Sequence, residues 1–90
     1  MEKGFNSNVS LEGDNFHVQT EDWGVHNPFV VSRVYRGGAV VKSVKTSYSE
    51  ILSLRATSPL AESSAVLAIR MAVREQHQKI LDQLLSGQLF

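Results

Sequence analysis

The first half of the chain alternates apolar and polar residues, a pattern typical of half-buried β-strands. The alternation is clearest where Phe16, Val18 and Thr20 are separated by polar neighbours. Turn residues separate this run from the apolar-polar run before it. The pattern predicts four strands, near residues 5–11, 15–21, 29–36 and 39–46.

The last two predicted strands flank Gly37-Gly38, which indicates a hairpin with a two-residue turn. This turn would pair Tyr35 with Val40. The same register pairs Val34 with Val41, Arg33 with Lys42, Ser32 with Ser43, Val31 with Val44 and Phe29 with Thr46. Both faces of the hairpin are then partly apolar, so we expect the second face to be covered as well.

The second half of the chain predicts one long helix. Ser47 to Glu50 has a capping-box pattern that can open a short helical turn through Leu52, within a connector over 47–58. Ser58 is the predicted N-cap, and the helix should run over about 59–86 to a left-handed Gly87. An apolar stripe follows it: Leu60, Val66, Ile69, Val73, Ile80 and Leu84, widened by Leu67, Met71, Leu81 and Leu85.

This helix is longer than the sheet predicted beside it. From Ser58 to Gly87 it would measure roughly 42 Å at ~1.5 Å per residue, whereas a seven-residue strand reaches about 23 Å. We therefore expect a dimer or a larger protein partner to cover the rest of the stripe. The residues predicted to make this contact are Trp23, Leu81, Leu84, Leu85, Leu89 and Phe90. The expected fold class is α+β: a four-stranded antiparallel meander followed by one long helix.

Length and composition indicate the number of domains, the kinds of site that are absent and the expected location of the protein. Ninety residues suit one domain over 1–90, and the chain has no cysteine, so disulfides and thiolate metal sites are excluded. No run approaches the ~20 apolar residues of a membrane span, and the N-terminus lacks a signal-peptide core, which favours a cytoplasmic protein.

Charge is unevenly distributed although the formal net charge is zero. Residues 1–28 hold five acidic side chains against one lysine, whereas residues 29–48 hold four basic side chains and no acid. The four form a possible anion or nucleic-acid patch: Arg33, Arg36, Lys42 and Lys45. Phe29 and Tyr35 could stack bases beside it, but the zero net charge disfavours this use.

No motif predicts catalysis, a cofactor or a metal. His17, His26 and His77 lack the spacing of a metal site. No serine lies in a nucleophile elbow, and no glycine-rich loop precedes a helix. His77 interrupts the apolar stripe and is expected to be partly buried and hydrogen-bonded to a neighbour, with a pH-responsive contact as the alternative.

Several segments carry a resemblance to known proteins: FHVQTEDWG (16–24), NPFVVSRVYRGG (27–38), KTSY (45–48) and MAVREQHQKIL (71–81). Together they resemble a group of small bacterial proteins of the deltaproteobacterial kind. The resemblance implies no catalytic residues. Genomes of this kind contain small adaptors that act with Ras-like polarity and motility GTPases, which implies an accessory regulator of such a GTPase as one function.

Two function classes follow from these patterns. The preferred hypothesis is a non-catalytic interaction or regulatory adaptor module that docks through its long amphipathic helix. The alternative is single-stranded nucleic-acid binding, since four strands followed by a helix resemble the architecture of PUR-alpha and Whirly proteins, and fold-level likeness does not by itself establish function.

Overall fold

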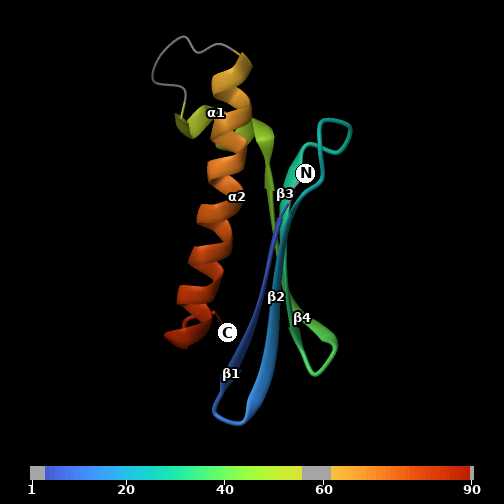
Figure 1. The fold of residues 1–90 in the computed structure, drawn as a ribbon, viewed down its shortest axis with the longest axis vertical. Helices are drawn as coiled ribbons and strands as arrows, with labels where there is room; N and C mark the ends of the chain where they lie inside the picture. Colours follow the sequence, from blue (N-terminus) through green and yellow to red (C-terminus); the bar gives the residue numbers. More distant parts are fainter. Residues whose placement is uncertain (1–3, 56–61, 90) are drawn as a thin grey trace.

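The computed structural model describes residues 4–55 and 62–89. Four antiparallel strands form one sheet in the order β1-β2-β3-β4, and a long helix lies across one of its faces (Figure 1). The strands are β1 (Gly4–Leu11), β2 (Asp14–Asp22), β3 (Phe29–Arg36) and β4 (Ala39–Ser47). The helices are α1 (Tyr48–Arg55) and α2 (Glu62–Leu85). The α+β prediction is confirmed, and all four strands end within one residue of their predicted bounds.

The helix α2 is continuous through residues 75–78, as predicted. The expected N-cap at Ser58 and the apolar Leu60 lie outside the described residues. Neither described helix is long and apolar enough to cross a membrane.

The hairpin between β3 and β4 departs from the predicted register. Gly37 and Gly38 adopt φ angles of 57° and 88°, which only glycine reaches without strain, and Tyr35 lies opposite Val40 as predicted. Beyond this pair, a β-bulge inserts Val41 into β4. The observed partners are Val34 with Lys42, Arg33 with Ser43, Ser32 with Val44, Val31 with Lys45, Val30 with Thr46 and Phe29 with Ser47. The predicted pairs in this part of the hairpin were therefore wrong by one residue.

The bulge has a physical reason in the side chains that it turns toward α2. Because paired residues share a face of the sheet, Val44 and Thr46 lie on the face that holds the buried Val30 and Val34. Without the extra residue, Ser43 and Lys45 would occupy these positions. Burial of an aliphatic side chain in place of a lysine favours the bulged register.

The apolar core between sheet and α2 consists of two clusters. One contains Phe16, Val18, Val34, Ile80, Leu84 and Leu89. The other contains Val30, Ile51, Ile69, Ala72 and Val73, with Phe5, Tyr48 and Leu52 packed against it. Ile51 and Leu52 belong to α1, so this short helix covers part of α2. This part of the apolar stripe was expected to need a second chain, but α1 of the same chain covers it.

The start of α1 and the end of α2 show the predicted caps. Ser47 Oγ accepts a hydrogen bond from the Glu50 amide at 3.1 Å, as an N-cap does. After α2, the Gln88 amide donates to the Gln83 carbonyl at 2.8 Å and Gly87, at φ 76°, donates to Leu84 at 3.3 Å. This pair of bonds is a Schellman motif, which reverses the chain and returns Leu89 to the core.

Candidate functional site

A line of polar side chains crosses the middle of the sheet beneath α2 and separates the two apolar clusters. Each strand contributes one hydroxyl and α2 contributes two neighbouring side chains. We call this set the polar belt: Ser7, Thr20, Ser32, Thr46, Gln76 and His77. Thr20 and Ser32 are 0% and 1% exposed and His77 is 6% exposed, so the centre of the belt is sealed from water.

The hydrogen bonds of the polar belt link its six side chains in one continuous series. Thr46 Oγ1 donates to Gln76 Oε1 at 2.8 Å, and Gln76 Nε2 donates to Ser32 Oγ at 2.9 Å. Ser32 Oγ lies 2.7 Å from Thr20 Oγ1, which lies 2.8 Å from His77 Nδ1. The other ring nitrogen, His77 Nε2, lies 2.9 Å from Ser7 Oγ. Every strand is thus joined to α2 through this series.

The direction of these bonds determines the state of the imidazole. Gln76 Nε2 also faces the carbonyls of Val30 and Val44, at 3.4 and 3.5 Å, which assigns this atom as the donor nitrogen. Both buried hydroxyl protons of the belt find an acceptor within it when Ser32 accepts from Gln76 and donates to Thr20, and Thr20 donates to His77 Nδ1. The imidazole is then neutral with its proton on Nε2, which donates to Ser7. Burial, and secondarily the charge of His17, lower the pKa of His77 below its usual 6.5.

All four segments that carry the sequence resemblance contribute to the polar belt. Thr20 belongs to FHVQTEDWG, Ser32 to NPFVVSRVYRGG, Thr46 to KTSY, and Gln76 and His77 to MAVREQHQKIL. His77 was expected to be buried at least in part and hydrogen-bonded to a neighbour, and the structure confirms this. The other members of the belt were not predicted, because a single serine or threonine in a strand carries no signal of the residue opposite it.

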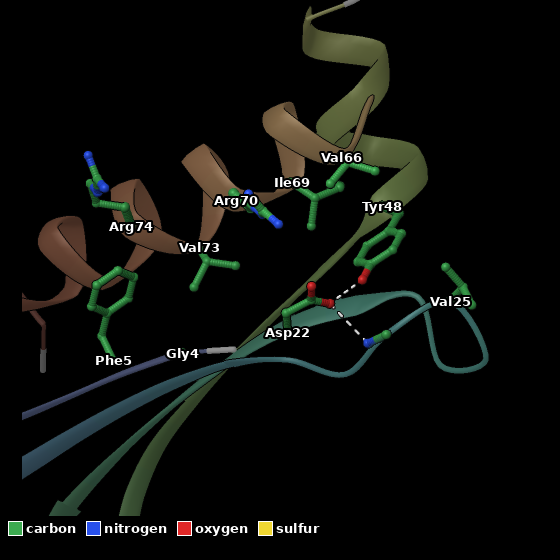
Figure 2. A pocket seen from close by; sticks show the side chains of 11 residues that line it. Gly4, Phe5, Asp22, Val25, Tyr48, Val66, Ile69, Arg70, Val73 and Arg74 are labelled. Carbon is green, nitrogen blue, oxygen red and sulfur yellow. Dashed lines mark hydrogen bonds between the residues drawn. The ribbon is translucent and has the colours of Figure 1, made fainter. Parts of the chain in front are cut away.

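Asp22 and Tyr48 lie beyond the polar belt, where β2 ends. One carboxylate oxygen of Asp22 accepts hydrogen bonds from the Tyr48 hydroxyl and, at 2.9 Å, from the Gly24 amide. The second oxygen points away from both donors, toward α2 (Figure 2). Burial and the neighbouring Asp22 raise the pKa of Tyr48 to about 12, so the phenol remains a neutral donor at physiological pH.

A groove opens between this end of the sheet and the N-terminal half of α2. Its volume is about 550 Å³. We call it the α2 groove; it is lined by Gly4, Phe5, Asp22, Gly24, Val25, Tyr48, Val66, Ile69, Arg70, Val73 and Arg74 (Figure 2). The lining is mostly apolar, with two arginines on the helix side and one carboxylate on the sheet side. This size and chemistry are typical of a ligand or peptide site.

The sheet face that α2 does not cover carries the predicted aromatic anchor. The Trp23 ring centroid lies 5.5 Å from the Arg33 guanidinium carbon and 5.4 Å from Lys45 Nζ. Lys45 Nζ also lies 4.1 Å from the centroid of Phe29. We call Trp23, Phe29, Arg33 and Lys45 the open-face cluster. Its cation–π contacts hold Trp23, which is 38% exposed, against the sheet.

The structure divides the basic patch that the sequence suggested. Arg33 and Lys45 join the open-face cluster, but Arg36 and Lys42 lie opposite Phe16 and Val34, on the face that carries α2. Arg36 pairs with Asp14 at 2.8 Å. The four cations therefore do not form one surface, because adjacent strand residues point to opposite faces.

The residues predicted to contact a partner are also divided. Leu84 and Leu89 are 2% and 7% exposed, and Leu81 packs partly buried against the same cluster. Leu85 is 56% exposed, and Phe90 lies outside the described residues. The chain itself covers Leu84 and Leu89, since the Schellman turn brings the chain end back onto the sheet. Apart from Leu85, the large apolar side chains of α2 that the structure shows exposed lie in its N-terminal half: Val66, Leu67 and Met71.

Comparison with protein-family models, curated proteins and solved structures finds no match for this chain. In the part of the chain that the structure describes, the α2 groove and the open-face cluster are the two surfaces whose geometry suggests a function.

Proposed function

We propose that this protein is a non-catalytic interaction module that docks a larger regulatory protein through the α2 groove. The observation that supports this most is an apolar groove of about 550 Å³ bordered by the 54%-exposed Val66. Apolar side chains left at the mouth of such a groove are typical of surfaces that bind another molecule. The docking surface proposed here is still on the long helix, as the sequence suggested. It lies in the N-terminal half of α2 and not at its C-terminal end.

The test is a binding experiment with groove and control variants. A purified Ras-like polarity or motility GTPase, the partner class that the resemblance implies, is the first candidate to immobilise. Val66→Asp places a charge at the mouth of the groove and should release the partner. Leu85→Asp changes a side chain of similar exposure, 56%, at the other end of α2 and should retain it. Equal release by both variants, or by neither, would contradict docking through the groove.

The open-face cluster favours a second candidate, single-stranded nucleic-acid binding. Trp23 and Phe29 could stack on bases while Arg33 and Lys45 contact phosphates. Fluorescence anisotropy with labelled oligonucleotides would then show binding that weakens steeply with salt. Arg33→Glu and Lys45→Glu should abolish it, whereas Lys42→Glu, on the other face, should not. Absence of binding at low salt would exclude this function.

A further inference from the structure

The two sides of the α2 groove carry opposite charges. Arg70 and Arg74 are exposed and lie one helical turn apart on α2, whereas Asp22 is the only acidic residue among the described residues of the lining. Among the residues that the structure describes, neither arginine takes part in an ion pair. Guanidinium groups bind carboxylates through paired hydrogen bonds, so the helix side of the groove is suited to an acidic group.

The apolar part of the lining lies between these charges. Ile69 and Val73 are buried at its base, and Val66 and Val25 are exposed at its mouth, with Val25 at 79%. An aliphatic or aromatic side chain placed here would remove apolar surface of both valines from water, which favours binding.

The position of Asp22 indicates what else the occupant must supply. Its free oxygen points into the space beside α2, and a hydrocarbon tail laid over it would leave a carboxylate oxygen without a donor (Figure 2). A peptide satisfies this group, because a backbone N–H can donate to Asp22 while a side chain fills the apolar base. A fatty acid has the required acidic head but no such donor.

We propose that the α2 groove binds a peptide segment of the partner in which an aliphatic or aromatic anchor is flanked by acidic residues. The acidic residues pair with Arg70 and Arg74, and the anchor packs on Ile69 and Val73. This inference rests on the proposed docking function and adds the chemistry of the docked segment.

The test uses three short capped peptides and nuclear magnetic resonance of the full chain. The first carries a Leu-Phe anchor with two glutamates on each side. The second replaces the glutamates by lysines, and the third replaces the anchor by two serines. We expect the acidic anchored peptide to shift the amide signals of Val25, Val66 and Ile69, with affinity about tenfold or more above that of the other two.

Charge reversal of the helix side provides the decisive comparison. In the variant Arg70→Glu/Arg74→Glu, the preference should change from the acidic to the basic peptide. The control, Arg33→Glu/Lys45→Glu, changes net charge equally on the open face and should keep the acidic preference. Arg74→Glu alone should reduce the preference if the double variant does not fold.

Two groups of results would overturn the inference. Equal affinity of the acidic and basic peptides, or no groove shifts with either, would exclude the acidic segment. Tighter binding of sodium decanoate than of the acidic peptide would assign the groove to a fatty acid. The docking function fails separately, when Val66→Asp does not release the partner protein.

Discussion

At the scale of single residues, His77 couples folding to pH. Both ring nitrogens of its imidazole are bonded to hydroxyl groups, and the ring centroid lies 5.7 Å from that of Phe5. A second ring proton, on Nδ1, would need Thr20 to accept and therefore to turn its own proton toward Ser32. The Ser32 proton would then lose its acceptor in the polar belt, so protonation of the imidazole costs the belt one hydrogen bond.

We expect stability to fall as His77 is protonated. Its pKa in the folded state lies below the 6.5 of the unfolded chain, so the unfolded state binds more protons between these two values. The contribution is complete above about pH 6.5 and decreases as pH falls toward the folded pKa. Urea unfolding at a series of pH values measures this dependence. His77→Gln should flatten it over this range, and His26→Gln, at an exposed position, should not. If the stability of His77→Gln fell with pH as steeply as that of the unmodified protein, His77 would not be the group responsible.

Thr20 is the residue of the polar belt whose substitution should lower the free energy of unfolding most. Thr20→Val preserves the shape of the side chain but removes its hydroxyl, so His77 Nδ1 loses its donor and Ser32 loses its acceptor. We expect a loss of about 1–3 kcal/mol in the free energy of unfolding, because both groups are buried. Chemical denaturation of this variant beside Ser43→Ala, an exposed serine of β4, provides the measurement. A cost no greater than that of Ser43→Ala would show that water replaces the hydroxyl.

At the scale of elements, the end of α2 distinguishes burial within the chain from burial by a partner. Leu84 is 2% exposed and belongs to the core, whereas its neighbour Leu85 is 56% exposed. Leu84→Ala should cost about 2–5 kcal/mol through lost burial and the cavity left behind. Leu85→Ala should cost well under half of that in the same thermal or urea unfolding experiment. Both variants are compared at a concentration at which the chain is a monomer, and similar costs there would mean that the helix is rotated about its axis.

At the scale of the whole molecule, the apolar residues that remain on the outer side of α2 favour self-association. Leu67, Met71 and Leu85 are 56%, 44% and 56% exposed. We expect a dimer that forms in a concentration-dependent way, in which this side of the helix faces its copy about a two-fold axis. Light scattering over a dilution series should give twice the mass of one chain at tens of micromolar. Leu67→Asp should return it to the mass of one chain, and a constant single-chain mass in the unmodified protein would rule the dimer out.

The strands and helices of this protein follow from local patterns along the chain. Period-two alternation, the Gly37-Gly38 turn, the Ser47 cap and Gly87 each depend on residues close together in the chain, so the strands, α1 and the continuous α2 could be predicted. His77 could be singled out for the same reason, as a polar residue in an apolar stripe. The α+β class followed from the order of these elements.

Contacts between residues far apart in the chain could not be predicted from such local patterns. The bulge at Val41 depends on what α2 buries, and the polar belt unites six side chains from five elements. The α2 groove lies between α2 and the end of the sheet where β1 begins and β2 ends. Leu89 is covered because the chain turns back at Gly87. Local patterns specify backbone conformation, but burial and hydrogen-bond partners depend on which surfaces meet when the elements pack.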